Sequence, residues 1–342
     1  MDLSRRTFLT AAGAAATVAM VPGRVLADRW TGTEGVRLPD ALVQVLDDRF
    51  AKYRISLAKV ERLWTGAMWA EGPVWFGDQR CVIFSDIPNN RMLKYDEQSK
   101  KVTIFRQPSN FGNGNARDNQ GRLITAEHGG GRRISRTEYD GTITILCDKF
   151  EGKQFNSPND VVVKKDDSIW FTDPPFGIGG HYEGYKAKAL LPWDVYRWDA
   201  KTKQVAMVAN DIKGPNGLCF SPDESKLYIV EARTSPRQIR VYDVTANGTQ
   251  LTNSRVFTTC GPLAADGMRC DRDGNLWVGV GGGEGKDGVA IYAPDGKQIG
   301  MINTPERVAN VCFGGPNRNR LYMTGTTSLY ALYTEAEGAT LG

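Results

Sequence analysis

Residues 159–173 read "NDVVVKKDDSIWFTD": a polar residue, a short apolar run, a turn, and a second apolar run that ends in an acid. The β-branched and aromatic residues of both runs favour strands, and the charged residues between them favour a tight turn. The stretch therefore predicts two antiparallel strands, with Asn159 at the start of the first and Asp173 at the end of the second.

The same arrangement recurs five more times along the chain. Each unit begins at a polar residue, here called its anchor, and the anchors are Glu71, Asn115, Asn159, Asn216, Asp266 and Asn310. Successive anchors are 44, 44, 57, 50 and 44 residues apart. Six units of this length, rich in strand-forming residues and in Gly, Asp and Asn turns, predict an all-β fold, a six-bladed β-propeller. An open sandwich with coincidental spacing is the alternative.

The two ends of the repeat region indicate how the ring closes. From Asn310 to Gly342 there are 33 residues, which is 11 fewer than a unit of 44. Residues 60–70, just before the first anchor, are also 11 in number. We therefore expect the propeller to span residues 60–342, with residues 60–70 completing the last blade and removing two exposed sheet edges.

The first 27 residues have the pattern of an export signal. Arg5 and Arg6 precede an apolar run that ends near a small-residue cleavage site at residues 25–27. This pattern predicts a twin-arginine signal and a periplasmic mature protein exported in its folded state. An ordinary secretory signal and an uncleaved anchor are the alternatives.

Residues 28–59 are expected to form an N-terminal extension outside the ring. Within it, residues 39–53 place apolar side chains on one helical face, which predicts a short helix packed on the propeller. These side chains are Leu42, Val45, Leu46 and Phe50.

Charge and cysteine content exclude several classes of protein. The formal net charge is +4, from 43 Lys and Arg against 39 Asp and Glu, and the charges are interspersed. This pattern argues against nucleic acid or, after signal cleavage, a membrane as partner. The six cysteines show no C-x-x-C or zinc spacing and several lie in apolar runs, so we expect buried free thiols. Oligomeric state cannot be inferred from these features.

If each anchored strand is innermost in its blade, the anchors surround one mouth of the central channel. Any one Asn or Asp before Gly is better explained as a turn residue, but six equivalent positions favour a shared role. Glu71 and Asp266 supply carboxylates, and Asn159 and Asn216 supply amide oxygens. This oxygen-only set predicts one bound divalent cation, Ca²⁺ first, with Mg²⁺, Mn²⁺ and Zn²⁺ as alternatives.

Further candidates flank the anchors at the same rim. The second strands of the first four units end in acids, namely Asp86, Glu127, Asp173 and Glu231. His128 follows one of these acids, and residues 176–194 form an insertion that would overhang the mouth or be a plain surface loop. We expect Asn115, Asn159, Asp173 and His128 to contact the substrate.

The chain resembles the gluconolactonase family, which includes regucalcin (senescence marker protein), from about residue 60 to residue 330. The resemblance is carried by strings such as "WAEGPVWF", "NSPNDVVV", "GPNGLCFSPDESKLYIVEA", "DGMRCDRDGNLWV" and "TPERVANVCFGG". It implies a six-bladed propeller with one divalent metal in the channel mouth. By motif, the metal ligands match Glu71, Asn216 and Asp266, and Asn159 matches a residue at the metal or the substrate. Ser157 stands where regucalcin-like members place a substrate arginine, so His128 or the insertion would take that role.

The resemblance implies hydrolysis of a sugar lactone, such as glucono-1,5-lactone, to the aldonic acid. In this hypothesis the metal polarises the carbonyl and activates water, with Asp266 as general base and His128 as the second candidate. Two alternatives stay open. One is a hydrolase of another lactone or ester, and the other is a non-catalytic binding propeller that contains a metal.

Overall fold

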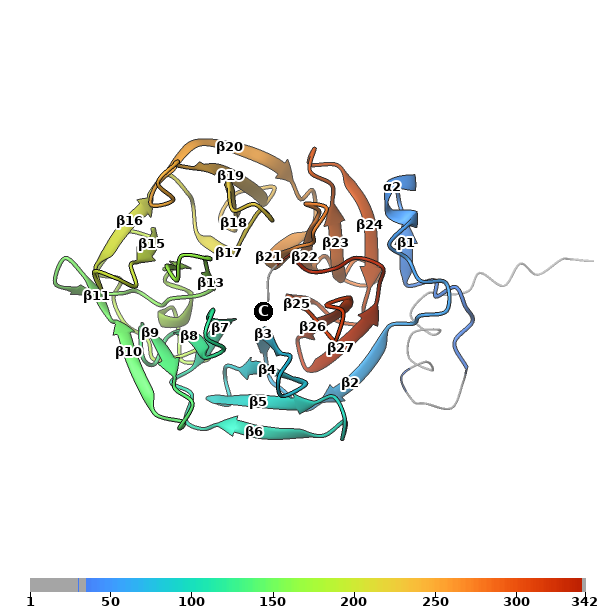
Figure 1. Cartoon of the computed structure of the whole chain (residues 1–342), viewed down its shortest axis with the longest axis horizontal. Coiled ribbons are helices and arrows are strands. Elements are labelled where there is room, and N and C mark those ends of the chain that lie inside the picture. The colour runs from blue at the N-terminus through green and yellow to red at the C-terminus, as the bar shows by residue number, and fades with distance from the viewer. Residues whose placement is uncertain (1–29, 31–34, 340–342) are drawn as a thin grey trace, which may run out of the picture. The chain divides into compact units, whose positions relative to one another are not determined.

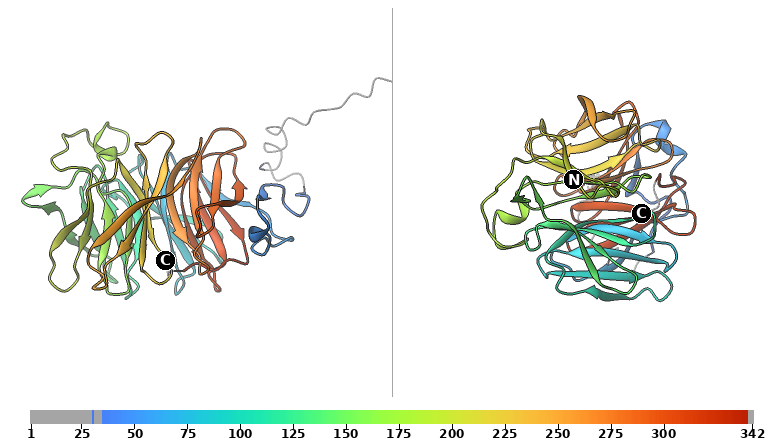
Figure 2. Two further views of the ribbon diagram at one scale, coloured as in Figure 1. Left: turned by 90° about the horizontal axis from the view of Figure 1, so that it is seen from above. Right: turned by 60° about the vertical axis from the view of Figure 1, so that its left-hand side comes forward.

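The computed structural model describes residue 30 and residues 35–339, and residues 36–339 belong to one compact unit. In this unit, six antiparallel sheets are arranged like blades around a central axis (Figure 1). Figure 2 shows the ring edge-on, with the strands of neighbouring blades running between its two faces. The predicted six-bladed β-propeller is therefore confirmed.

Each blade has four strands that follow one another outward from the axis, and the fifth blade has an additional outer strand. The first blade contains β3 (Ala70–Phe76), β4 (Cys81–Asp86), β5 (Arg91–Asp96) and β6 (Val102–Arg106). The second contains β7 (Gly112–Arg117), β8 (Leu123–Glu127), β9 (Arg133–Thr137) and β10 (Ile143–Cys147). The third contains β13 (Val161–Val163), β14 (Ile169–Thr172), β15 (Val195–Trp198) and β16 (Val205–Ala209).

The remaining blades follow the same plan. The fourth contains β17 (Pro215–Phe220), β18 (Lys226–Glu231), β19 (Gln238–Val244) and β20 (Leu251–Thr259). The fifth contains β21 (Ala264–Cys270), β22 (Leu276–Gly281), β23 (Gly288–Tyr292) and β24 (Gln298–Asn303). The sixth contains β25 (Val308–Gly314), β26 (Arg320–Gly325), β27 (Ser328–Tyr333) and, outermost, β2 (Glu61–Thr65). A small ribbon of β11 (Lys149–Phe150) and β12 (Lys153–Gln154) joins the second blade to the third.

The ring closes between its first and last blades through β2. This strand lies just before the first blade in sequence, yet it pairs antiparallel with β27 of the sixth. Behind it, Trp75 of the first blade stacks on Tyr322 of the sixth, with ring centroids 5.6 Å apart and an interplanar angle of 13°. Burying an aromatic pair of this kind contributes several kcal/mol, so the closure is both a hydrogen-bonded and an apolar contact.

The N-terminal segment differs from the predicted helix over residues 39–53. The helix α2 covers only Asp48–Ala51, and Asp47 caps it by accepting the backbone N–H of Arg49. Before it, β1 (Val43–Val45) pairs with β24 as a fifth strand of the fifth blade. The helical prediction was wrong here because Val43 and Val45 are β-branched and an unpaired strand edge lay within reach. Of the residues expected on the helical face, Phe50 is buried and Leu46 is exposed.

The core lies between neighbouring blades rather than at the axis. Trp170 meets Phe220 edge-on between the third and fourth blades, and Trp277 meets Phe313 in the same way between the fifth and sixth. The six cysteines are free thiols, five of them buried, as expected from the sequence. Among the described residues, no helix is long and apolar enough to cross a membrane.

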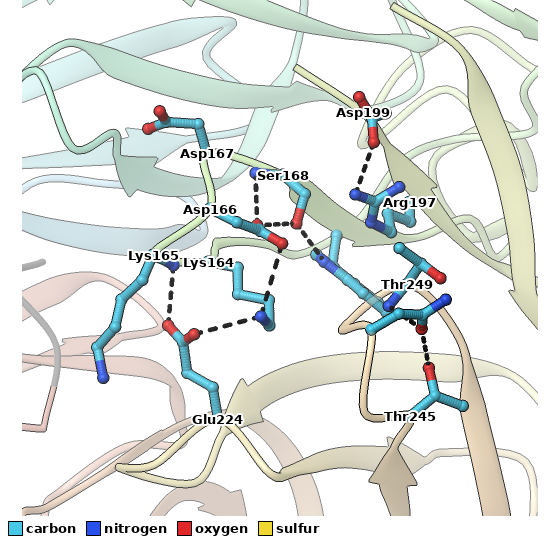
Figure 3. A network of polar contacts seen from close by, with 12 residues as sticks. Lys164, Lys165, Asp166, Asp167, Ser168, Arg197, Asp199, Glu224, Thr245 and Thr249 are labelled. Atoms are coloured by element: carbon cyan, nitrogen blue, oxygen red, sulfur yellow. Dashed lines mark hydrogen bonds and ion pairs between the residues drawn. The ribbon is translucent and has the colours of Figure 1, made fainter. Parts of the chain in front are cut away.

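Polar contacts join the third and fourth blades at the end opposite the anchors. There, Lys164 Nζ lies 3.6 Å from Asp166 Oδ2 and 3.5 Å from Glu224 Oε2 (Figure 3). The backbone N–H of Lys165 also donates to Glu224, at 2.9 Å. These ion pairs fasten the turns of two blades, so this end of the ring is held by structural contacts.

Candidate metal centre and cavity

In four blades, the innermost strand is interrupted by a β-bulge at a polar residue that is followed by glycine. The pairing register shifts there in β3, β7, β17 and β21. The polar residues are Glu71, Asn113, Asn216 and Asp266, and the glycines are Gly72, Gly114, Gly217 and Gly267. Because a bulge re-aims the side chain it carries, these four residues point toward the axis at one mouth of the channel.

The glycines let neighbouring innermost strands approach each other closely. A Cβ atom on Gly267 would lie 2.0 Å from Cγ of Asn310, and one on Gly72 would lie 2.2 Å from the carbonyl oxygen of Asn113. Any larger residue would push the strands apart. The polar residues of successive blades therefore converge on a small region around the axis.

A cavity of about 410 Å³ opens at this mouth. All four residues predicted to bind metal line it, namely Glu71, Asn159, Asn216 and Asp266. Asn113 lines it as well, and the outer wall is formed by Trp69, Phe176, Tyr182, Glu183, Arg233, Arg237 and Arg307. The structure thus brings the predicted ligand set together, and its metal-binding role stays a prediction.

Two buried carboxylates dominate the electrostatics of this region. Burial raises the pKa of Glu71, and repulsion from Asp266 raises it further. Burial also raises the pKa of Asp266, against the opposing effect of the nearby guanidinium groups of Arg307 and Arg237. Two ionised carboxylates in one desolvated region destabilise the folded protein unless a cation binds beside them.

The chemistry of these side chains fits a hard divalent cation. Arg307 Nη2 donates to Oδ2 of Asp266, at 2.5 Å. Among the described residues, no group donates to Oδ1 of Asp266, so this oxygen is able to bind a cation. Asn159 and Asn216 add neutral oxygens, and all four side chains are at most 7% exposed. In residues 30 and 35–339 no three His, Cys, Asp or Glu side chains converge as a metal site. A site here would therefore consist of two carboxylates and two carboxamides.

Two further polar side chains of the inner strands are buried and do not line the cavity. Asp160 and Asn310 occupy the position that is glycine in the other four blades, and Asn310 Nδ2 lies 3.5 Å from Asp160 Oδ2. Arg269 Nη1 lies 3.7 Å from the same carboxylate. Strict strand alternation would point Asp160 away from the channel, but β13 begins only at Val161, so Asp160 lies outside the regular pleat.

Two residues expected to contact substrate are buried away from the cavity. Asn115 is fully buried, and its amide donates to Gly72 O, Ser85 Oγ and Asn113 O. Because the bulge in β7 precedes it, Asn115 points into the sheet contact and Asn113 takes the place at the cavity. Asp173 is also fully buried, and its two oxygens accept the backbone N–H groups of Asn156 and Ser157 at 2.8 Å. The structure therefore does not place either side chain at the cavity.

Two of the other acids at the ends of second strands are also structural. Asp86 accepts from Arg91, and Glu127 accepts from Arg106, Arg133 and Ser135. Neither lines the cavity, because each side chain turns back to its own or a neighbouring strand.

His128 lies behind the cavity wall rather than in it. Its ring is fully buried, and Nδ1 is 3.0 Å from the carbonyl oxygen of Pro158, next to Asn159. Because that oxygen can only accept, Nδ1 carries a proton, and the other ring nitrogen faces Glu183, with 3.5 Å from Nε2 to Oε2. Glu183 does line the cavity, whereas His128 does not. The structure thus places Glu183 between His128 and the cavity, instead of the direct substrate contact expected for His128.

The insertion of residues 176–194 overhangs the mouth. It begins with the 3₁₀ helix η1 (Phe176–Ile178), and Phe176, Gly180, Tyr182 and Glu183 line the cavity. Glycines allow the insertion to pack closely on the second blade. A Cβ on Gly177 would lie 2.3 Å from the His128 ring, and Gly129 forms a β-bridge with Gly184. The insertion is therefore one wall of the cavity, not a plain surface loop.

Sequence reasoning missed Asn113, Glu183 and the three arginines of the wall. The dipeptide of a polar residue followed by Gly, shared with Glu71, Asn216 and Asp266, would have identified Asn113. The arginines lie in connections between strands, where the repeat sets no position, so only the structure reveals them.

The comparisons with known proteins now decide the family. Residues 69–327 match the family described as the SMP-30/Gluconolactonase/LRE-like region. The chain belongs to the gluconolactonase family. A gluconolactonase of Zymomonas mobilis is 30% identical over 301 residues, which cover 82% of each chain. Regucalcin of Xenopus laevis is 26% identical over 266 residues, covering 74% of this chain and 82% of that one.

A solved structure leads to the same family. The gluconolactonase of Xanthomonas campestris superposes with a TM-score of 0.79 at 33% identity, covering 85% of this chain and 94% of that one. The gluconolactonase resemblance expected from the sequence is thereby confirmed, and the protein is a lactone-hydrolysing enzyme.

Proposed function

We propose that this gluconolactonase-family enzyme hydrolyses a sugar lactone such as glucono-1,5-lactone to the aldonic acid, in a reaction that depends on a divalent metal. The observation that carries the proposal is the pair of buried carboxylates, Glu71 and Asp266, beside two carboxamides in a cavity of about 410 Å³. A cavity of this size admits a single sugar ring.

Glu71, Asn159, Asn216 and Asp266 would hold the cation, and Ca²⁺ is the first choice because every donor is an oxygen. When bound, it supplies a Lewis acid for the lactone carbonyl and favours ionisation of water. Asn113, also in the cavity, is placed to donate a hydrogen bond to a substrate hydroxyl.

Glu183 is the best-placed group to move the proton. One oxygen of Asp266 already accepts from Arg307, and the other would bind the cation, so neither oxygen of Asp266 is left to take a proton. Glu183 reaches the cavity from the insertion and has His128 behind it. Water adds to the carbonyl carbon and gives its proton to Glu183, and that proton moves to the ring oxygen as the C–O bond breaks. His128 is a positioning residue, because it touches Glu183 and not the substrate.

The reaction would take place in the periplasm. The proposal rests on the twin-arginine pattern at Arg5 and Arg6, which lies outside the described residues. A fusion of residues 1–40 to a reporter that is active only after folded export would test it, with Arg5 and Arg6 both changed to Lys as control.

The decisive assay is proton release from glucono-1,5-lactone, corrected for spontaneous hydrolysis, with and without chelator. We expect activity to vanish with chelator and return with Ca²⁺. Asp266→Asn should lose metal binding and activity together, whereas Glu183→Gln should keep metal binding and lose at least about a hundredfold in kcat. Full activity of the metal-stripped enzyme would contradict the mechanism. Tight lactone binding without turnover would instead indicate a binding propeller.

A further inference from the structure

Three arginines line one side of the cavity, and together they are called the arginine arc. Arg233 and Arg237 come from the connection between β18 and β19 in the fourth blade, and Arg307 stands just before β25 in the sixth. The fifth blade, between them, contributes Asp266. Guanidinium groups from the fourth and sixth blades thus line the same cavity as the proposed metal ligands.

The structure fixes each of these side chains. Arg307 lies over the ring of Trp69, 5.4 Å from its centroid, and a Cβ on Gly281 would come within 2.7 Å of Arg307 Cδ. Arg233 lies over the ring of Phe176 at 5.2 Å. Arg237 donates from Nη1 to the carbonyl oxygen of Ala265, at 3.0 Å, next to Asp266. The arc is therefore a built wall rather than a group of mobile surface side chains.

The arginines outnumber the acids that pair with them. Within the described residues, Arg307 forms an ion pair with Asp266, whereas Arg233 and Arg237 form none. Burial lowers the pKa of Arg237, the negative charge of Asp266 opposes this shift, and the positive charges of Arg307 and Arg233 add to it. Like charges held together in a partly buried wall are unfavourable without an anion between them.

The charge balance of the whole cavity points the same way. Its wall carries Arg233, Arg237 and Arg307 against Glu71, Glu183 and Asp266, so it is neutral in formal charge. A divalent cation would add two positive charges. A neutral lactone leaves that excess uncompensated, whereas a lactone with its own carboxylate reduces it.

We propose that the preferred substrate is a lactone that carries a free carboxylate, the mono-lactone of a sugar diacid, with the carboxylate bound by Arg233 and Arg237. This inference rests on the proposed function. Guanidinium groups match a carboxylate in a planar, two-point geometry that a hydroxyl does not offer. The alternative is that the arginines serve only the carboxylate that appears in every product.

The test compares kcat/KM for glucaro-1,4-lactone, which carries a carboxylate, with kcat/KM for its neutral counterpart glucono-1,4-lactone. We expect the acidic lactone to be favoured at least about tenfold at low ionic strength, and the ratio to fall as salt is added. Arg237→Gln should lower the ratio about tenfold, and Arg237→Lys should give an intermediate ratio because it keeps the charge and loses the fork. The same ratio is measured for Arg233→Gln.

The matched control is Arg255→Gln. Arg255 lies on β20, outside the cavity, paired with Asp243 at 2.9 Å, so its loss changes the net charge equally and should leave the ratio unchanged. Equal kcat/KM for both lactones without salt dependence would overturn the inference and leave the proposed function standing. Failure to hydrolyse either of these lactones or glucono-1,5-lactone would overturn both.

Discussion

Asn113 and Asn115 lie two residues apart on β7 and have opposite surroundings. Asn113 faces the cavity, whereas Asn115 is fully buried, and its amide donates three hydrogen bonds while Oδ1 accepts one from Thr125. At the scale of single residues, the bulge decides which of these two asparagines faces the cavity.

This difference predicts distinct effects of two matched substitutions. Asn113→Ala should lower kcat/KM for the lactone about tenfold and change the free energy of unfolding by less than about 1 kcal/mol. Asn115→Ala should cost about 2–4 kcal/mol, because it leaves several buried polar groups unpaired. Urea unfolding and lactone kinetics on both variants check this. A larger loss of stability in Asn113→Ala would contradict the assignment.

Asp173 provides a second prediction at this scale. Burial raises its pKa to about 8, although two backbone N–H groups oppose the shift. Because the folded pKa exceeds the unfolded value, the folded state retains the proton between these two values. Stability is then fully present below about pH 4 and falls as pH rises toward 8, by up to about 1.4 kcal/mol per pH unit.

Urea unfolding at pH 5 and pH 8 measures this contribution. Excess Ca²⁺ should be present at both pH values, so that the carboxylates of the cavity remain ionised. Asp173→Ser removes the titrating group, and its stability should decline less between the two pH values than that of the wild type. An equal decline would show that Asp173 is already ionised at pH 5.

At the scale of elements, the insertion of residues 176–194 depends on a close contact with the second blade. It supplies Glu183 and Tyr182 to the cavity, and it packs on His128 through Gly177. The position of Glu183 therefore depends on a contact between residues that are far apart in the sequence.

Gly177→Ala should displace the insertion, because its Cβ would lie 2.3 Å from the His128 ring. We expect kcat to fall at least about tenfold and limited proteolysis within residues 176–194 to accelerate. Gly179→Ala is the matched control, since its Cβ would meet only ordinary contacts, the nearest at 3.5 Å. Unchanged kcat in Gly177→Ala would show that the insertion does not position the reacting groups.

At the scale of the whole molecule, the proposed metal position joins the first, third, fourth and fifth blades. Glu71, Asn159, Asn216 and Asp266 come from four different blades, with Asn159 just before the first strand of its blade, and the ring is otherwise closed by β2 and by packing between blades. A ligand that binds only the folded ring stabilises all of it together.

Calcium at about one hundred times its Kd should stabilise the fold by about 2.7 kcal/mol, which raises Tm by roughly 5 °C. Scanning calorimetry of the chelated protein, with and without Ca²⁺, measures the shift. In Asp266→Asn it should shrink to less than about 1 °C. A full shift in this variant would place the ion elsewhere.

The sequence by itself determined the number of blades, because each blade repeats the same short pattern of apolar runs and turns. It also determined the oxygen chemistry at the mouth, since the anchors are set by that repeat. It misplaced the N-terminal strand, Asn115, Asp173 and His128. The local pattern does not show where a bulge forms, because a bulge depends on how two strands pair. It also does not show that the N-terminal strand can pair with a sheet edge far along the chain.

Only the tertiary structure decided which polar groups share the cavity. Glu183 and the three arginines come from connections of unequal length, whose positions follow from packing between blades rather than from the repeat. Likewise, burial of Asp173 and His128 depends on segments that fold over them from elsewhere in the chain. The fold follows from a short pattern that repeats along the chain, whereas the site is assembled from segments that are far apart in the sequence.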